Sequence, residues 1–437
     1  MGCAIMQIEK PTTGQIIKKM REIRKVPQEK LAELIYFGRT TLSNIETGIQ
    51  ECSDDLLNSI KEVLDLDGLP IHEHERSIFK NRLHEWYNII SERRYDEAKV
   101  LREALSIIQY LPHDIELNNL FSLFDCRLLL NLNELDAAKK ILDDFECKQG
   151  EIGEVQLYHH YYNQGIYNAK KDRNEIALDY YLKSYEAMKF GDGKNINLYF
   201  NIAHCYERLG YVSLAITFLE DALTLDTFGK NNVPEFHIYN ALGVCYSHIK
   251  LAQRARVLLD KAHAIAVNDY KENASKDNKL KLCMVLTNRG YMYRLVKTWH
   301  KAIEYLDKAA QYTEKEHPYY LEILYQKART LMEIGRQQSC LNLINEGVEL
   351  SKDNEEYAAR FKALGLLREL NEKLANELED KILPYFQDNN IYMELLDFAI
   401  VLRDYYKTQR ASKKRALKMS DIACTILNRM LEGGVIE

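Results

Sequence analysis

Apolar residues recur at helical spacing near the start of the chain and predict a small module of short helices. A helix over residues 13–25 carries Ile16, Ile17, Met20 and Ile23 on one face. A second helix begins at Pro27, because proline is tolerated in a first helical turn. The break Tyr36–Phe37–Gly38 forces a change of direction before a third helix near Arg39, and residues 56–64 form a closing helix. The pattern predicts a helix-turn-helix.

A second pattern repeats through the rest of the chain. A small or aromatic residue is followed twelve positions later by alanine or cysteine, and successive pairs are 38 to 47 residues apart. Twelve residues allow one helix to end, turn and begin an antiparallel partner, and small residues let the two helices touch. The pairs are Trp86/Ala98, Cys126/Ala138, Gly165/Ala177, Ala203/Ala215, Gly243/Ala255, Gly290/Ala302 and Ala328/Cys340, with fainter continuations at Ala363/Ala375 and Ala399/Ala411.

This register resembles tetratricopeptide repeats, best at residues 201–222, 240–262 and 288–309. The periods exceed the about 34 residues of the simple repeat, so helices or turns must be longer. We expect an extended loop at Asn268–Asn273. The resemblance implies an all-α fold in which a helix-turn-helix domain precedes a right-handed superhelix. The expected divisions are a DNA-binding domain (10–68), a linker (69–78) and a repeat domain for peptide binding and oligomerisation (79–437).

Composition supports an all-α protein, since 46% of residues are hydrophobic and only 7 of 437 are proline. The nine cysteines are dispersed without a Cys-x-x-Cys pair, which argues against a zinc ribbon or a disulfide framework. The pair His72 and His74 is better explained by a charged linker than by a metal site. We therefore expect no metal and no cofactor. Because no long apolar run or signal peptide is present, we expect a cytoplasmic protein without a membrane partner.

Charge is unevenly distributed along the chain. The net charge is −6, which disfavours nucleic-acid binding over the whole surface. Residues 10–45, however, hold eight basic and three acidic residues, a local +5. A second basic run, over residues 407–418, is better explained by a solvated face than by a DNA arm, and residues 419–427 are a candidate cap or dimer contact. Phosphate contacts are therefore expected at the N-terminal module.

The third helix of the module has the side chains needed to read bases in a major groove, with Leu42 and Ile45 facing inward. Arginine bonds guanine, asparagine bonds adenine, and threonine offers a hydroxyl and a methyl group. The candidate base-reading residues are Arg39, Thr40, Thr41, Ser43 and Asn44, with Gln28 at a phosphate or base edge; the candidate phosphate contacts are Lys18, Lys19, Arg21 and Arg24. The alternative is an ordinary three-helix bundle.

Two short motifs give this module a family resemblance. Gln-x-x-Leu-Ala at residues 28–32 and Leu-Ser-x-Ile-Glu-x-Gly at residues 42–48 resemble the Cro/C1-type helix-turn-helix domain over about fifty residues. Two positions depart from that pattern. Tyr36 stands where the turn usually has glycine, and Gly38 where the helix cap is usually serine or threonine.

Carboxamides recur just before the small residue of the first helix in successive repeats. Such a ladder can bond a peptide backbone whatever its side chains, whereas nearby cations can meet a carboxylate. The alternative is that these amides only tie neighbouring helices together. The ladder is Asn163, Asn201, Asn240, Asn288 and Gln326, and the nearby cationic candidates are His204, Arg208, His248, Arg294 and Arg329.

The two resemblances together are similar to the peptide-pheromone receptors of Gram-positive bacteria and their phages, the quorum-sensing and arbitrium-type receptors. They imply a homodimeric transcription regulator with a double-stranded DNA operator and a short signalling peptide as partners. An adaptor or phosphatase-like regulator that binds a signalling protein is the alternative. The common catalytic motifs are missing from the sequence, so we do not expect an enzyme.

Overall fold

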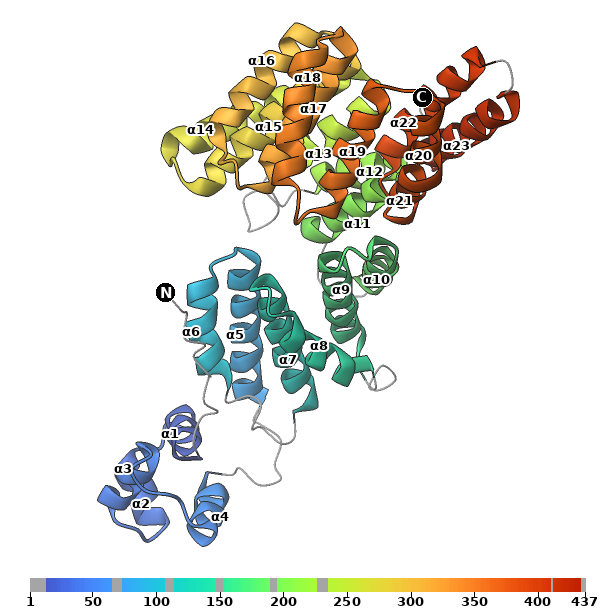
Figure 1. Ribbon diagram of the computed structural model, residues 1–437. Helices are drawn as coiled ribbons and strands as arrows, with labels where there is room; N and C mark the ends of the chain where they lie inside the picture. The colour runs from blue at the N-terminus through green and yellow to red at the C-terminus, as the bar shows by residue number, and fades with distance from the viewer. Residues whose placement is uncertain are drawn as a thin grey trace. The chain divides into compact units, whose positions relative to one another are not determined.

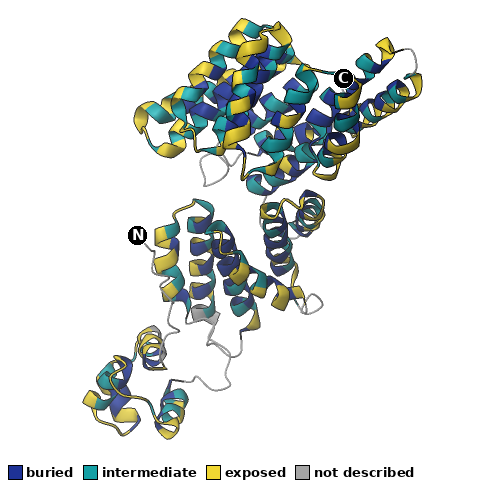
Figure 2. Cartoon of the chain, viewed as in Figure 1, coloured by how far each residue is buried: buried dark blue, intermediate teal, exposed yellow. Residues whose placement is uncertain are grey.

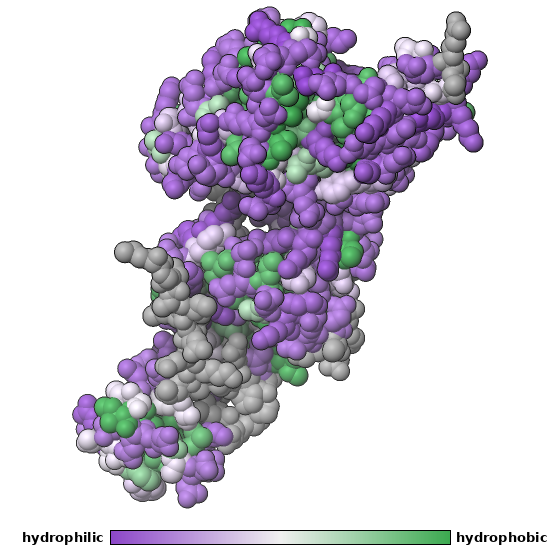
Figure 3. Space-filling model, in the orientation of Figure 1, coloured by the Kyte–Doolittle hydropathy of each residue, from purple (hydrophilic) through white to green (hydrophobic). Residues whose placement is uncertain are grey.

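The computed structural model describes residues 13–64, 73–106, 114–146, 152–188, 195–225, 235–409 and 412–433. Within these ranges every regular element is helical, which confirms the all-α prediction (Figure 1). The visible face is mainly hydrophilic (Figure 3). None of the helices in the described ranges has both the length and the apolar character needed to cross a bilayer.

Internal contacts divide the chain into two units. The first comprises residues 1–171 and 183–193, and the second comprises residues 172–182 and 194–437. The predicted division at residues 69–78 stays a prediction. Helix α5 begins at Glu73, so the second half of the expected linker is helical, whereas residues 69–72 lie outside the described ranges.

The N-terminal module contains four short helices around one small core. Leu31, Leu42 and Ile60 are almost completely buried in it. Helices α1 and α3 approach so closely at Gly14 that a Cβ atom there would lie 1.6 Å from the Ile45 carbonyl oxygen. Glycine is therefore required at this crossing. The helices are α1 (Thr13–Ile23), α2 (Gln28–Leu34), α3 (Arg39–Glu46) and α4 (Asp54–Val63).

Both departures from the family pattern lie in the turn between α2 and α3. Tyr36 has a φ of +57°, the left-handed conformation that glycine adopts most readily. Its side chain is 96% exposed, so the ring meets no steric obstacle there. Gly38 is the residue before α3, and it provides no side-chain cap for that helix. Tyr36 thus adopts a conformation that suits glycine better, and α3 begins without a side-chain cap.

Replacing Gly38 with serine is expected to stabilise this turn. Gly38 has a φ of −70° and a ψ of 137°, which serine adopts without strain. An added Cβ atom would lie 3.7 Å from the Thr41 hydroxyl, an ordinary contact. The cap and the lower entropy of the unfolded chain together give about 1 kcal/mol, or about fivefold slower hydrogen exchange in α3. Exchange measured on the full chain checks this result, and unchanged or faster exchange in α3 would contradict it.

The rest of the chain consists of antiparallel helix pairs, as the twelve-residue register predicts. Buried side chains face neighbouring helices and exposed ones face outward (Figure 2). The pairs of the first unit are α5 (Glu73–Ser91) with α6 (Tyr95–Leu105), α7 (Ile115–Asn131) with α8 (Leu135–Glu146), and α9 (Glu154–Lys170) with α10 (Asn174–Ala187), whose first half clusters with the second unit.

The second unit continues the array and ends in two less regular pairs. Its regular pairs are α11 (Ile196–Arg208) with α12 (Val212–Thr224), α13 (Glu235–His248) with α14 (Ala252–Glu272), α15 (Lys276–Leu295) with α16 (Trp299–Ala309), and α17 (Pro318–Ile334) with α18 (Gln337–Leu350). The less regular pairs are α19 (Glu355–Arg368) with the broken helix α20 (Glu372–Glu377) and α21 (Leu383–Asp388), and α22 (Tyr392–Thr408) with α23 (Lys413–Leu431).

The small anchors lie at the helix crossings, as predicted. A Cβ atom on Gly243 would lie 2.5 Å from Leu259, and one on Gly290 would lie 2.7 Å from Leu306. At the first pair the larger anchor Trp86 donates its indole N–H to the Ala98 carbonyl at 2.8 Å. Ala363 and Ala375 are also buried, whereas Ala411 lies outside the described residues.

One predicted loop is wrong. Residues 268–272 belong to α14, which extends to Glu272, and α15 begins only four residues later at Lys276. The long period at this repeat therefore comes from longer helices. Lys281 pairs with Asp269 at 2.5 Å, and Asn278 donates to the Asp269 carbonyl at 3.0 Å, so the polar residues that suggested a loop stabilise the helix ends.

The last helix of the second unit packs back against an early one. Helix α23 contacts α12, and the Arg429 guanidinium lies 5.2 Å from the Tyr211 ring and 4.5 Å from the Tyr392 ring (Figure 1). The basic run at residues 407–418 is not entirely solvated, because Arg415 and Lys418 both pair with Glu379. The C-terminal helices therefore stabilise the second unit through contacts with its other helices.

Candidate functional site

Helix α3 presents the predicted base-reading face. Arg39 is 65% exposed and its Nη1 lies 3.9 Å from the Glu29 carboxylate, a distance that leaves the guanidinium available. Thr40 is also exposed, whereas Thr41, Ser43 and Asn44 are half-buried. Leu42 and Ile45 are buried, so the inward and outward faces of this helix are those expected.

The basic residues of α1 divide into two groups. Lys18 and Lys19 are exposed, as phosphate contacts require. Arg21 instead lies inside the module, where its Nε and Nη2 donate to the Glu46 carboxylate at 2.7 and 2.9 Å. Its hydrogen bond to Glu46 raises the pKa of Arg21. Arg24 is half-buried. Arg21 thus has a structural partner inside the module, and its predicted phosphate contact stays a prediction.

Gln28 belongs to the same internal cluster. Its side-chain amide donates to Glu46 at 2.9 Å, and the Glu46 side chain is only 2% exposed. The glutamate therefore joins α1, α2 and α3 at one buried point. This bond occupies the side-chain amide of Gln28, and its predicted contact with a phosphate or a base edge stays a prediction.

Two cavities open between the first helices of the repeats in the second unit. The main cavity, about 400 Å³, is lined by residues of α11, α13, α15, α17 and α19 and by residues 390–394 at the start of α22. The small cavity, about 190 Å³, is lined by residues of α11 to α13, α15 and α17. Glu207, Val244 and Tyr319 line both cavities. The main cavity has a mixed polar and apolar lining, whereas the small one is lined mainly by apolar side chains.

Six of the ten predicted peptide-binding residues lie around these cavities. Asn288 donates its amide to Asn240 at 3.0 Å and so links the two cavities. The six are Arg208, His248, Asn288 and Gln326 at the main cavity, and His204 and Asn240 at the small one. Here the structure gathers the predicted side chains, although the assignment of a peptide to them remains a prediction.

Two predicted asparagines lie elsewhere. Asn163 is buried in the first unit, where it donates to the Leu123 carbonyl at 2.8 Å and accepts from Arg127 at 2.7 Å. It ties helices together, which is the alternative that the sequence left open. Asn201 is half-buried and lines neither cavity. The predicted peptide contacts of both residues stay predictions.

Two predicted arginines are already paired with acids. Arg294 is buried and its Nη1 donates to Glu333 at 2.7 Å. Arg329 donates from Nη2 to Asp397 at 2.7 Å. Burial acts to raise the pKa of Asp397, but the charges of Arg329 and Arg294 and the hydrogen bond from Arg329 together outweigh it, and the pKa is lowered. Each of these arginines therefore already has an acidic partner within the protein.

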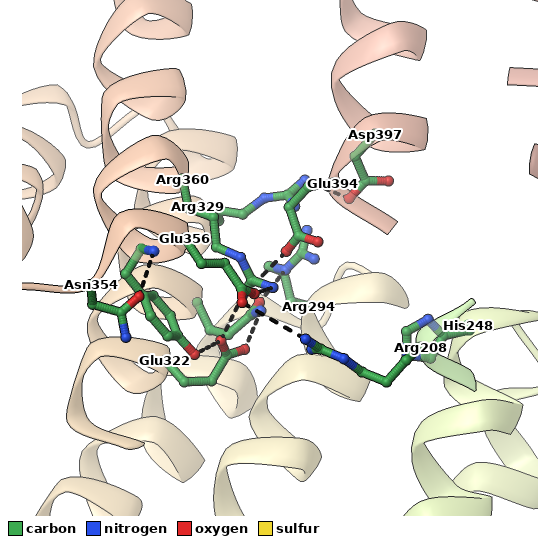
Figure 4. Close-up of polar contacts among 12 residues, drawn as sticks. Arg208, His248, Arg294, Glu322, Arg329, Asn354, Glu356, Arg360, Glu394 and Asp397 are labelled. Atoms are coloured by element: carbon green, nitrogen blue, oxygen red, sulfur yellow. Dashed lines mark hydrogen bonds and ion pairs between the residues drawn. The ribbon is translucent and has the colours of Figure 1, made fainter. Parts of the chain in front are cut away.

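The sequence did not predict the charged cluster at one wall of the main cavity. Arg360 pairs with Glu356 at 2.5 Å, with Glu322 at 3.1 Å and with Glu394 at 3.6 Å (Figure 4). Tyr357 also donates to Glu322, at 2.8 Å. The i, i+4 spacing of Glu356 and Arg360 on α19 was the available local signal. Glu322 and Glu394 come from other repeats, and nothing in the twelve-residue register points to them.

Burial perturbs two further groups in the main cavity. It raises the pKa of Glu394, and Arg360 offsets only part of that effect. It lowers the pKa of His248, whose Nδ1 has no hydrogen-bond partner among the described residues. His248 is therefore neutral near pH 7. Within the described part of the chain no three His, Cys, Asp or Glu side chains gather as metal ligands would.

Comparison with known proteins agrees with this architecture. A tetratricopeptide repeat model matches residues 196–227. The transcriptional activator NprA of Geobacillus stearothermophilus is 24% identical over 415 residues, which cover 89% of this chain and 97% of that protein. Response regulator aspartate phosphatase J of Bacillus subtilis (strain 168) is 27% identical over 122 residues, covering 25% of this chain and 32% of that protein.

Among solved structures, NprR in complex with its cognate peptide NprX superposes with a TM-score of 0.63. The identity is 21%, and the match covers 80% of this chain and 99% of that one. The chain thus combines four short N-terminal helices with an array of tetratricopeptide-like helix pairs. The chain is similar in sequence to NprA and in fold to NprR, which agrees with the resemblance to quorum-sensing peptide receptors drawn from its sequence.

Proposed function

We propose that the chain is a DNA-binding transcription regulator whose repeat domain binds a short signalling peptide. The observation that carries the proposal is the set of carboxamides along the two cavities: Asn288 and Gln326 line the main cavity, and Asn240, bonded to Asn288, lines the small one. Carboxamides supply both donors and acceptors for a peptide backbone. The relatives support the proposal, since NprA is a transcriptional activator and NprR was solved with its peptide NprX.

The DNA contacts in this proposal come from α3 and the exposed part of α1. Arg39 and Thr40 are exposed near the start of α3, where a recognition helix meets base edges. Lys18 and Lys19 supply phosphate contacts. A palindromic operator requires two such modules, so we propose a homodimer, with residues 10–68 as its DNA-binding domain and residues 79–437 as its peptide-binding and oligomerisation domain. A regulator of this kind works in the cytoplasm.

The proposed switch is a shift between conformations of the repeat array. A peptide held by several repeats favours one arrangement of the helices that it touches. The change alters the spacing of two DNA-binding modules, and a differential affinity of 1 to about 3 kcal/mol suffices for a five- to about 150-fold change in operator binding.

Paired substitutions test the two halves of the proposal. Arg39→Ala is expected to weaken binding to an operator selected in vitro by about tenfold or more, because an arginine–guanine contact contributes roughly 1–3 kcal/mol. Asn288→Ala is expected to keep the basal operator affinity and to reduce the response to peptides identified by mass spectrometry of the purified native protein. Fluorescence anisotropy with and without those peptides measures both effects.

The matched control is Arg256→Ala, which removes an exposed arginine on α14. It should match the unmodified chain in both measurements. If operator affinity is the same with every co-purifying peptide and without any, regulation by peptide is excluded. If Arg39→Ala behaves like Arg256→Ala, α3 is not the base-reading helix.

The second candidate is an adaptor or phosphatase-like regulator, because part of the chain is similar to an aspartate phosphatase. In that case the array binds a signalling protein, and the DNA-binding module is dispensable. A partner captured by the full chain and equally by residues 71–437 would favour this candidate.

A further inference from the structure

The main cavity has an excess of negative charge in its walls. Its charged lining residues are the acids Glu207, Glu322, Glu356 and Glu394 and the bases Arg208 and Arg360. Four carboxylates therefore face two guanidinium groups. His248 also lines the cavity but is neutral near pH 7.

A single side chain, Arg360, pairs with three of these four carboxylates. Arg360 lies within 3.6 Å of Glu322, Glu356 and Glu394 (Figure 4). Arg208 reaches Glu356 only at 3.9 Å. The neighbouring Arg294 and Arg329 do not change this balance, because each pairs with an acid of its own, Glu333 or Asp397. One guanidinium is thus the shared counter-charge of three carboxylates.

Glu394 is the least satisfied of these acids. Its side chain is 9% exposed, yet no hydrogen bond reaches its carboxylate from the described residues, and its ion pair with Arg360 spans 3.6 Å. Buried carboxylates normally accept several hydrogen bonds, since desolvation of an unpaired charge is costly. The carboxylate lines the cavity, where a ligand can complete its shell.

Aromatic rings complete the surroundings of this acid. Four tyrosines line the same cavity, and arginines of the protein already lie over three of their rings, so the rings attract cations here; the four are Tyr291, Tyr319, Tyr357 and Tyr392, and all but Tyr319 have such an arginine. The face of a tyrosine ring attracts cations, and more strongly where water is excluded. Acids and tyrosine faces together favour a cationic group over an anionic or neutral one.

We propose that the main cavity selects peptides by a cationic group, either a lysine or arginine side chain or a free α-amine, which pairs with Glu394 and Glu322 among the tyrosine rings. This inference rests on the proposed peptide-receptor function and adds the chemistry of the ligand. It replaces the acidic ligand that Arg294 and Arg329 had suggested. In this proposal the carboxamides bind the peptide backbone, and the carboxylates favour peptides that carry a cationic group.

Hexapeptide libraries provide the test, with the full chain as receptor. The first libraries are N-acetylated and C-amidated, with lysine fixed at one position and uncharged residues elsewhere. Matched libraries carry norleucine or glutamate at that position. One further library has only uncharged side chains and a free α-amine. Affinity is measured by competition with a fluorescent member of the best library. We expect lysine or the free amine to bind at least about tenfold more tightly than norleucine, and glutamate to bind most weakly.

Glu394→Gln keeps the size of the side chain and removes its charge, so the preference for a cation should fall to about threefold or less while norleucine peptides still bind. Glu322→Gln is a second variant with the same expected direction. Glu349→Gln, which changes an acid that is 70% exposed on α18, should keep the full preference.

Equal affinity for lysine and norleucine libraries, or a preference that survives both cavity substitutions, would overturn this inference but would not contradict the proposed peptide-receptor function. Binding by no library would overturn the receptor proposal as well.

Discussion

Replacing Glu46 with alanine is expected to unfold the N-terminal module and to abolish specific operator binding, while the repeat array stays folded. The Glu46 carboxylate accepts hydrogen bonds from Arg21 at 2.7 and 2.9 Å and from Gln28 at 2.9 Å. Its removal leaves the Arg21 guanidinium, whose side chain is 11% exposed, without a counter-charge. Breaking a buried ion pair costs roughly 3–5 kcal/mol, which is comparable to the whole stability of a domain this small.

Hydrogen exchange of the full chain measures this effect in each part separately. Amides of α1 to α3 should exchange as in an unfolded segment, and those of α13 to α17 should be unchanged. Glu46→Gln is expected to retain part of the protection, because the amide oxygen still accepts from Arg21. Glu33→Ala removes an exposed acid paired with Lys30 and should change protection by less than about threefold. Native protection of α3 in Glu46→Ala would show that the cluster does not hold the module together.

The helix pairs could be predicted from the sequence because their packing depends on residue size at a fixed interval. Gly243 and Gly290 leave no room for a side chain at the crossing with the following helix, and that requirement is visible in the sequence as the twelve-residue register. Helix length was less predictable. Asn268 to Asn273 have weak helical propensity, but packing between α14 and α15 extends the helix over most of them.

The polar site could be predicted only in part, because equivalent sequence positions have different neighbours. Asn163 and Asn288 both stand two positions before the small residue of their repeats, yet Asn163 bonds Leu123 and Arg127 whereas Asn288 lines a cavity. The ion pairs of Arg21 with Glu46 and of Arg360 with Glu394 join residues 25 and 34 positions apart, at no repeated spacing. Such partners are set by how the helices pack, so the sequence alone did not reveal them.

Replacing Arg360 with methionine is expected to destabilise the second unit strongly at neutral pH and much less in mild acid. Methionine keeps much of the side-chain volume, but Glu322, Glu356 and Glu394 then lose their shared counter-charge. The loss is roughly 3–5 kcal/mol, or a fall in melting temperature of about 10 °C for a unit of this size. Circular dichroism or scanning calorimetry at pH 7.5 measures it.

The sign of the pH dependence follows from Glu394. Burial already raises its pKa in the folded protein, and removal of Arg360 raises it further above the unfolded value of 4.5. The folded state then binds a proton that the unfolded state has released, so stability increases as the pH falls towards 4.5. Asp397 acts in the opposite direction, because Arg329 lowers its folded-state pKa and its contribution is lost in acid.

The difference between Arg360→Met and the unmodified chain should therefore narrow when both are measured at pH 5.5 instead of pH 7.5. Adding Glu394→Gln to Arg360→Met should recover part of the loss at pH 7.5 and weaken its pH dependence, since the deepest unpaired charge is then absent. Lys352→Met, which removes an exposed cation on the turn after α18, is the matched control and should melt within about 1 °C of the unmodified chain. An equal loss at both pH values, with no recovery in the double variant, would mean that Arg360 stabilises the array through packing and not through charge.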